Sequence, residues 1–143
     1  YWYWANDMEV RSNAFNPNPI SWSKHKVWFQ KKINENSTSL FVVESELSPI
    51  GQVRFEQSGK NFFISYSIAR QFRGLGLGKK LLSRVIEVFS LNRRINLVGE
   101  VKKNNLASAK VFENLEFQEI SHPHEKEQIR RFQLKFSPPL RHE

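Results

Sequence analysis

The segment RQFRGLGLGKKLL, residues 70–82, combines bare backbone with positive charge. Its glycines stand at alternate positions, 74, 76 and 78, with arginines before them and lysines after them. A glycine-rich turn that opens a helix leaves backbone N–H groups without partners at the positive end of the helix dipole. Such a turn can bind a phosphate group. Because a tight strand-to-helix turn needs fewer glycines, the pattern favours an anion-binding loop.

Two familiar phosphate-binding motifs do not fit this spacing. A P-loop places four residues between its glycines and follows its lysine with Ser or Thr. Here three residues separate Gly74 from Gly78, and Lys79 precedes Lys80. A dinucleotide fingerprint would need glycine at position 79 and would follow a first strand, whereas this segment lies in the middle of the chain. The spacing that remains is R-x-x-G-x-G, beginning at Arg73.

The rest of the chain supplies the elements that must position this loop. Its 143 residues suit one domain that buries about two thirds of the surface of the unfolded chain. We predict the end of a helix at residues 1–6, interrupted by NDMEVR at 6–11, and an extended loop at 15–20. Ser21 is the predicted cap of a helix at 22–33, with an apolar face made of Trp22, His25, Phe29 and Ile33.

Further along, residue types and periodicity predict strands at 39–45, 50–57 and 61–69, a helix at 77–90, a strand at 95–101, a helix from Asn105, and strands at 117–121 and 128–136 around the turn HPHEKE. The first three strands form an antiparallel meander. The helix between the strands at 61–69 and 95–101 indicates a crossover and a parallel pair. The predicted fold class is α/β (α+β), with a mixed, mostly antiparallel central sheet and helices on both faces.

Amino-acid composition limits the cellular setting of the protein and the classes of partner that it can bind. Lys and Arg total 22 against 14 Asp and Glu, and the net charge of +8 favours a polyanionic partner such as nucleic acid, an acidic membrane surface or a phosphorylated cofactor. Cysteine is absent, which excludes disulfides, thiolate metal sites and cysteine nucleophiles and favours a reducing setting. No apolar run reaches the roughly 20 residues that span a bilayer, and the first residues lack the layout of a signal peptide. We expect a soluble, cytoplasmic protein.

Two motifs together resemble a known family. Arg73-x-x-Gly76-x-Gly78 follows a predicted strand and begins a helix, and NLASAKVFENLEF at 105–117 follows it downstream. In that order the two motifs resemble the GNAT superfamily of N-acetyltransferases, and the element order agrees over residues 1–136. The resemblance implies one GNAT-like domain over 1–143. The first strand of that family would lie upstream of Tyr1, so we expect either that the chain begins after it or that the sheet edge is built differently.

The resemblance also implies a cofactor and its binding residues. Acetyl-CoA would be the acetyl donor, without a metal, and the acceptor amine would attack its thioester directly while both are bound. A backbone N–H near Ile68 would stabilise the developing oxyanion. The residues that would hold the cofactor are the end of the strand before the glycine loop, the loop itself and the start of the second signature helix: Ser67, Ile68, Ala69, Arg73, Gly74, Leu75, Gly76, Leu77, Gly78, Lys79, Asn105 and Ser108.

The resemblance also bears on the catalytic groups. The family commonly places a tyrosine in the second signature helix as the acid that protonates the departing thiolate, but the equivalent position here is Phe112. Tyr66 or a water is the alternative acid, and Glu100 and His25 are candidate bases. His25 has a competing interpretation as a packed residue, and Glu100 as a strand residue facing solvent. His122 and His124 lack a neighbouring set of metal ligands and are interpreted as surface residues.

A second resemblance, in the N-terminal third of the chain, concerns the acceptor. The segment ANDMEVRSNAFNPNPISWSKHKVWF is similar to the acceptor side of GNAT enzymes that act on nucleotide-linked amino sugars. Candidate substrate-binding residues are Arg11, His25, Trp28 and Arg54. The predicted partner is a small-molecule amine, without nucleic acid or membrane, and the predicted assembly is a monomer or homodimer. The alternatives are an acetyltransferase for protein N-termini or lysines and, from another class, a basic nucleic-acid-binding module.

Overall fold

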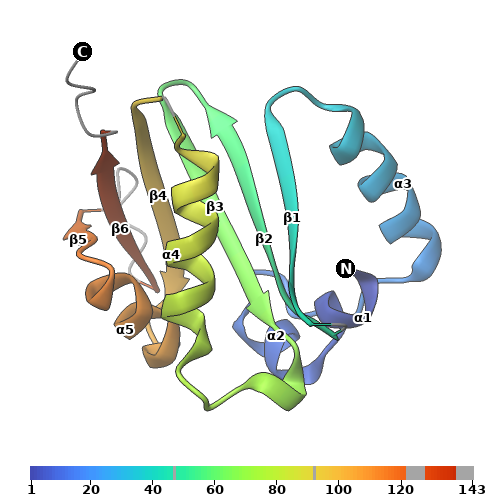
Figure 1. Cartoon of the computed structure of the whole chain (residues 1–143). Coiled ribbons are helices and arrows are strands. Elements are labelled where there is room, and N and C mark those ends of the chain that lie inside the picture. Colours follow the sequence, from blue (N-terminus) through green and yellow to red (C-terminus); the bar gives the residue numbers. More distant parts are fainter. Residues whose placement is uncertain (47, 92, 122–127, 138–143) are drawn as a thin grey trace.

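Helices and strands follow each other largely in the predicted order. The computed structural model describes residues 1–46, 48–91, 93–121 and 128–137. Its elements are α1 (Trp2–Ala5), α2 (Met8–Asn13), α3 (Trp22–Asn34), β1 (Thr38–Ser45), β2 (Ser48–Ser58), β3 (Asn61–Ile68), the 3-10 helix η1 (Arg70–Phe72), α4 (Leu77–Phe89), β4 (Ile95–Lys102), α5 (Leu106–Asn114), β5 (Gln118–Ile120) and β6 (Ile129–Phe136) (Figure 1).

The strands form one six-stranded sheet in the order β1-β2-β3-β4-β6-β5. Within the described residues β3 and β4 pair in parallel and the other neighbouring strands pair antiparallel. The mixed, mostly antiparallel sheet is therefore confirmed, as are the meander, the crossover through α4 and the pairing of the last two strands. The predicted turn HPHEKE at 122–127, with His122 and His124, lies outside the described residues.

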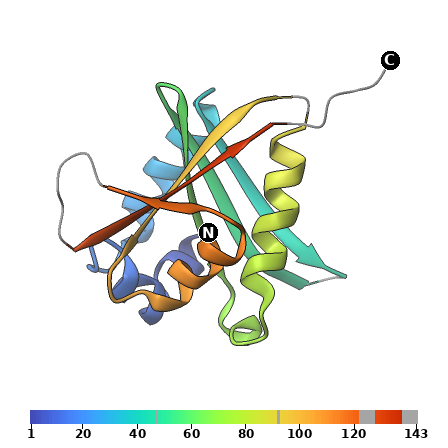
Figure 2. The same ribbon diagram turned by 90° about the vertical axis from the view of Figure 1, so that its left-hand side faces the viewer.

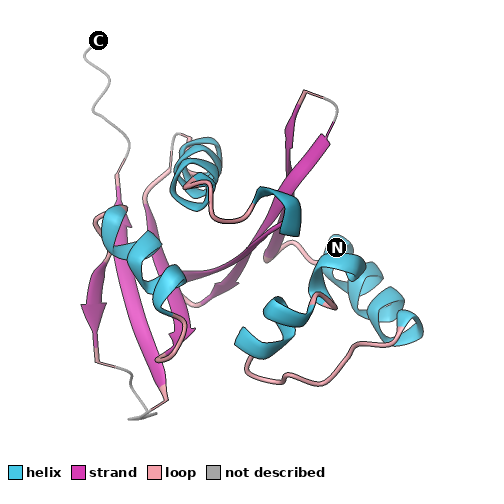
Figure 3. Ribbon diagram, turned by 90° about the horizontal axis from the view of Figure 1, so that it is seen from below, coloured by secondary structure: helices cyan, strands magenta, loops and turns pink. Residues whose placement is uncertain are grey.

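Helices cover both faces of the sheet, as predicted. The apolar side of α4 packs on one face, where the ring of Phe89 stacks on Phe55 of β2 at 4.0 Å between centroids. Phe112 of α5 belongs to the same core. On the other face, Lys32 of α3 forms an ion pair with Glu56 of β2 at 3.6 Å. Figures 2 and 3 show α4 and the α1–α3 group on opposite sides of the sheet.

The predicted break after the first helix is confirmed, but two features near the N-terminus differ from the prediction. NDMEVR does not only interrupt a helix, because Asp7 caps a second one: its carboxylate accepts hydrogen bonds from the backbone N–H groups of Glu9 and Val10 at the start of α2. The predicted apolar face of α3 is only partly buried, because Trp22 and Ile33 are 57% and 56% exposed.

Candidate active site

The central feature of the site is an opening between two neighbouring strands. β3 and β4 pair only from Asn61↔Asn96 to Phe63↔Val98, so their C-terminal halves are not joined to each other. At the closed end, Asn96 donates a hydrogen bond to Asn61 and accepts one from Gln133 Nε2 at 2.9 Å, which fixes the register of three strands. A cavity of about 590 Å³ lies at the open end, lined by both strands, α2, the glycine loop and α5.

The glycine loop forms one side of this cavity and has the backbone that an anion-binding loop needs. Gly74 and Gly76 adopt φ values of +75° and +70°, which L side chains rarely adopt. Gly76 is the N-cap of α4 and supplies no side-chain cap, so the first N–H groups of a 13-residue helix have no capping side chain. A Cβ on Gly74 or Gly76 would meet no atom of the described residues within 4 Å. The loop therefore presents bare backbone to open space and fits a phosphate group.

Gly78 has a different role, because it allows close packing. A Cβ there would lie 3.2 Å from Val111 Cγ2 and 3.5 Å from Ile68 Cδ1. The first turn of α4 can therefore approach both β3 and α5. Leu77 also lines the cavity, whereas the predicted cofactor residues Leu75, Lys79 and Ala69 do not.

Arg73 connects the loop to the end of β3. Its Nε donates a hydrogen bond to the carbonyl of Ile68 at 2.9 Å, and its Nη1 pairs with Asp7 at 2.8 Å and Glu9 at 3.2 Å. Its Nη2 is buried and has no hydrogen-bond partner among the described residues. Arg73 therefore ties the glycine loop to the end of β3 and to the acidic side chains of Asp7 and Glu9.

The start of α5 brings a buried hydroxyl pair to the cavity. The Asn105 side chain caps α5 by accepting a hydrogen bond from Ser108 N at 3.3 Å. The hydroxyl groups of Ser108 and Tyr66 are 2.9 Å apart. Burial raises the pKa of Tyr66 above its ordinary value of 10.0, although the hydrogen bond with Ser108 opposes this effect. Tyr66 is therefore a protonated hydroxyl at neutral pH.

Phe112 lies directly behind this pair and is almost fully buried. Its ring is in edge contact with Tyr66, at 6.1 Å between centroids. A Cβ on Gly99 of β4 would lie 2.5 Å from Phe112 Cζ, so only glycine leaves room for the ring against the strand. Phe112 carries no proton to donate, whereas Tyr66, whose ring contacts it, carries a hydroxyl group.

The alternation of side chains along the strands separates the cavity into two sides. Tyr66 of β3 points toward α4 and α5, and its neighbours in sequence point to the opposite face. That opposite side carries Gln52 and Arg54 of β2, Ser65 and Ser67 of β3, Glu100 of β4, and residues 9–15 of α2 and the following loop. We call it the acceptor side, and the side formed by the glycine loop and α5 the donor side.

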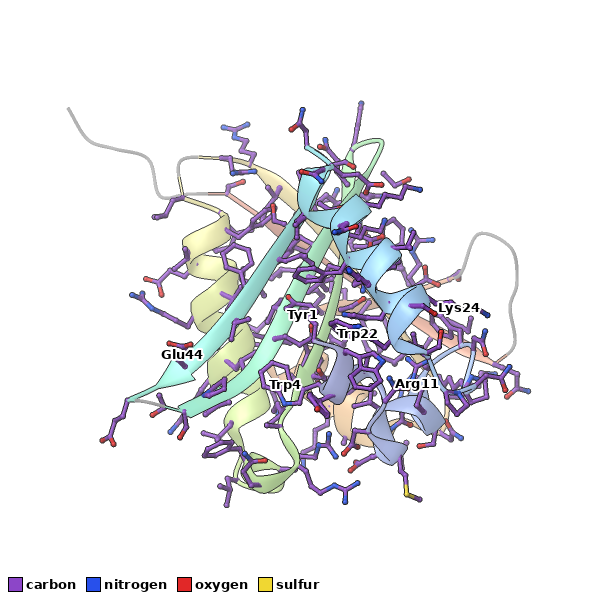
Figure 4. All side chains as sticks on the ribbon, turned by 90° about the vertical axis from the view of Figure 1, so that its right-hand side faces the viewer. Tyr1, Trp4, Arg11, Trp22, Lys24 and Glu44 are labelled. Carbon is purple, nitrogen blue, oxygen red and sulfur yellow. The ribbon has the colours of Figure 1, made fainter. Side chains whose placement is uncertain are left out.

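The acceptor side contains both predicted arginines. Arg11 Nη1 donates hydrogen bonds to the carbonyls of Asn16 and Asn18 at 3.1 and 3.2 Å, and its Nε is buried without a partner in the described part of the chain. Arg54 pairs with Glu56 at 2.9 Å, and its guanidinium lies over the ring of Trp28, 5.0 Å from the centroid. Figure 4 shows this side of the molecule, with Arg11 on α2.

Gln52, Glu9 and Phe15 line the same side but were not predicted from the sequence. Gln52 Nε2 donates a hydrogen bond to Ser67 Oγ at 3.0 Å, while its Oε1 is buried without a partner among the residues described. The only signal in the sequence for the place of Gln52 in the site was its alternation with core residues along β2.

His25 and Trp28 do not line the cavity. His25 is buried among the rings of Trp22, Trp28 and Phe29, and burial lowers its pKa below the ordinary value. The structure therefore does not bring His25 to the site as a base or a substrate contact, and its position corresponds to the competing interpretation of a packed residue. Trp28 reaches the site only through its contact with Arg54.

The described residues contain neither a metal-binding cluster nor a membrane-spanning helix. No group of three or more His, Asp or Glu side chains is arranged to hold a metal ion within residues 1–46, 48–91, 93–121 and 128–137. No helix in the same ranges is long and apolar enough to cross a membrane.

The sheet opens between two parallel strands, with an uncapped helix start on one side of the opening and a polar chamber on the other. This arrangement suits group transfer between a phosphorylated donor and a polar acceptor. Residues 1–118 match the model of the acetyltransferase (GNAT) domain, so the chain belongs to this family. It is an acyltransferase of the N-acetyltransferase type and uses acetyl-CoA as the acetyl donor.

Solved structures have the same fold. Spermidine N-acetyltransferase from Vibrio cholerae, in complex with CoA and spermine, is 21% identical, with a TM-score of 0.79 over 94% of this chain and 86% of that one. A domain from Methanocaldococcus jannaschii is 17% identical, with a TM-score of 0.78 over 94% and 89%. Campylobacter jejuni N-acetyltransferase PseH, in complex with acetyl coenzyme A, is 19% identical, with a TM-score of 0.70 over 81% and 80%. No curated protein sequence matches this chain.

Proposed function

We propose that this enzyme acetylates the primary amine of a small molecule that also carries anionic or polar groups, such as a nucleotide-linked amino sugar. The observation that carries the proposal is a single cavity that joins the bare glycine loop to a chamber lined by side chains of both charges. The Vibrio cholerae neighbour was solved with the small amine spermine, which supports a small-molecule acceptor.

On the donor side, this chain offers backbone groups and one guanidinium. The N–H groups at the start of α4 and Arg73 Nη2 would hold the phosphates of acetyl-CoA, and Asn105 and Ser108 would border its pantetheine arm. Ser67 and Ile68 end β3, where it no longer pairs with β4, and Ala69 follows directly. When bound, acetyl-CoA supplies an acetyl group activated as a thioester.

The backbone direction of β3 supports an oxyanion role for Ile68. Ala69 N donates to the carbonyl of Ile50 at 2.9 Å, on the β2 side. Because successive N–H groups of a strand point to opposite edges, the N–H of Ile68 points toward the opening. A donor there would stabilise negative charge on an attacked carbonyl oxygen, by about 3 kcal/mol in other acyl-transfer sites.

Proton transfer is assigned to one group on each side of the opening. Glu100 lies on the acceptor side, where an ammonium group must lose a proton before its nitrogen can attack. Tyr66 lies on the donor side and is protonated at neutral pH, so its hydroxyl is the proposed acid for the departing thiolate. Ser108, which shares a hydrogen bond with Tyr66, keeps this hydroxyl oriented.

The charges on the acceptor side favour one class of amine over another. A polyamine carries only positive charge and would need carboxylates around it. The acceptor side instead carries two arginines, Arg11 and Arg54, and two glutamates, Glu9 and Glu100. The unpartnered Nε of Arg11 and Oε1 of Gln52 can bind an acceptor and a donor group of the same ligand. An amine that also bears a phosphate and hydroxyl groups matches this set.

The test compares acceptors under one acetyl donor. Purified protein is incubated with acetyl-CoA and either a UDP-linked amino sugar, spermidine or a lysine-containing peptide, and release of the CoA thiol is measured. We expect the nucleotide-linked amine to give the largest kcat/KM. A preference for the peptide would favour the protein acetyltransferase alternative. Absence of thiol release with every amine, together with absence of thermal stabilisation by CoA, would refute the proposal.

Tyr66→Phe separates the acid from the binding site. The variant removes only a hydroxyl, so CoA should stabilise it as it stabilises the native protein. We expect kcat to fall by about a hundredfold, the usual effect of losing a general acid. An unchanged kcat would assign the acid step to another group, such as a water.

A further inference from the structure

One carboxylate joins the acceptor side to the donor side. Asp7 lies between α1 and α2, and its side chain is 10% exposed. Its Oδ1 accepts hydrogen bonds from the backbone N–H groups of Glu9 at 3.0 Å and Val10 at 3.4 Å. The carboxylate therefore caps α2, which contributes Glu9, Val10 and Arg11 to the cavity wall.

The same carboxylate binds the arginines around the glycine loop. Its Oδ1 pairs with Arg73 Nη1 at 2.8 Å, and its Oδ2 pairs with Arg70 at 3.1 Å. Arg73 in turn holds the carbonyl of Ile68 at 2.9 Å. A continuous series of hydrogen bonds therefore runs from the end of β3 through Arg73 and Asp7 to the first turn of α2.

The electrostatics support a strong link. Burial by itself would raise the pKa of Asp7, but the hydrogen bond and positive charge of Arg73, together with the backbone hydrogen bonds from Val10 and Glu9, outweigh this effect, and the pKa lies below its ordinary value. The carboxylate is therefore charged at neutral pH, and its hydrogen bonds to guanidinium groups are of the stronger, charge-assisted kind.

This link is one of the contacts that hold α2 in position, together with the hydrogen bond from Lys102 Nζ to the carbonyl of Ser12 at 3.2 Å. It has only six residues and none of them is buried, so neither its length nor its packing stabilises it strongly. Arg73 Nη2 has no partner among the described residues, and an anion at the glycine loop would supply one. An anion that holds the Arg73 guanidinium at the glycine loop would also hold the Asp7 carboxylate, which caps α2.

We propose that Asp7 is a positioning residue that couples the two halves of the site, so that α2 is fully ordered, and the acceptor side complete, only when the glycine loop holds an anion. The proposal rests on the proposed function, because it requires the phosphates of CoA at that loop. Linkage then requires that the cofactor and the acceptor strengthen each other's binding. In that case the carboxylate sets acceptor affinity without contacting the acceptor.

Hydrogen exchange of the α2 amides tests this coupling without measuring activity. The probe is CoA, added to saturation, and the measured segment is residues 8–13. In the native protein we expect CoA to slow exchange in this segment by about tenfold, within the usual range of coupling between sites. In Asp7→Asn we expect less than a twofold effect, because the asparagine oxygen still caps α2 while the charge that holds Arg73 is lost.

Two further variants sharpen the comparison. Arg73→Gln removes the link from the loop side and should also abolish protection of α2 at saturating CoA. Arg70→Gln removes an ion pair to the same carboxylate, but Arg70 is 68% exposed and does not line the cavity. It is the matched control and should retain the native protection.

The outcomes separate this proposal from the proposed function. If CoA stabilises the native protein but leaves α2 exchange unchanged, or protects α2 equally in Asp7→Asn, the coupling is refuted and the proposed function is unaffected. Loss of all CoA binding in Asp7→Asn would also refute it, because the carboxylate would then shape the loop itself. If CoA fails to stabilise the native protein, the proposed function fails first.

Discussion

Replacing Gly76 by alanine tests the glycine loop at the residue that begins α4. The backbone there has φ of +70°, so alanine is strained, but its Cβ would meet no atom within 4 Å. Gly59, in the turn between β2 and β3, has φ of +60° and equally open surroundings, and it does not line the cavity. Gly59→Ala is therefore a matched control. Each variant should lose about 1 kcal/mol of unfolding free energy to backbone strain.

The two variants should differ in their response to CoA. The methyl group of Gly76→Ala would stand in the space next to the uncapped N–H groups of α4, so we expect CoA affinity to fall at least about tenfold, which is about 1.4 kcal/mol. At a CoA concentration 100 times the native Kd, the native protein and Gly59→Ala should gain about 2.7 kcal/mol. Gly76→Ala should gain about 1.4 kcal/mol or less under the same conditions.

Chemical denaturation with and without CoA measures these gains, and calorimetric titration gives the Kd directly. Full stabilisation of Gly76→Ala by CoA would place the phosphates elsewhere and refute the assignment of the loop. Equal loss of the CoA effect in both variants would show that strain in a turn, and not the position of the methyl group, weakens binding.

Two further predictions concern buried residues. Gly99→Ala would place a Cβ 2.5 Å from Phe112 Cζ, and the Phe112 ring is held against Phe117 and Phe132. We therefore expect urea denaturation to show a loss of about 1–3 kcal/mol in the free energy of unfolding. A loss below about 0.5 kcal/mol would contradict this packing. Burial lowers the pKa of His25 in the folded protein below its ordinary value of 6.5. As the pH falls through 6.5, the imidazole therefore takes up a proton in the unfolded chain before it does so in the folded protein. The stability contributed by neutral His25 is therefore present above pH 6.5 and is lost as pH falls, so Tm should drop more between pH 7.5 and pH 5.5 in the native protein than in His25→Phe; equal drops would contradict the prediction.

Sequence determined the features that depend on near neighbours in the chain. Glycine at 74 and 76 is required by local φ values, and the apolar repeat from Leu81 to Phe89 defines the helix that follows. Alternating and β-branched residues predicted the strands. The interruption at residues 6–7 is confirmed, but helix α2 was not predicted, because Asp7 was interpreted only as a helix breaker, although the same side chain caps the next helix.

Only the tertiary structure decided which distant residues share the site. The separation of β3 from β4 after Phe63 and Val98 depends on strand pairing across the sheet and leaves no local pattern in the sequence. That opening brings Gln52 to the cavity, while α3 turns His25 into an aromatic cluster away from it. The ion pair between Asp7 and Arg73 likewise joins segments far apart in the chain, because charge and hydrogen bonding act through space.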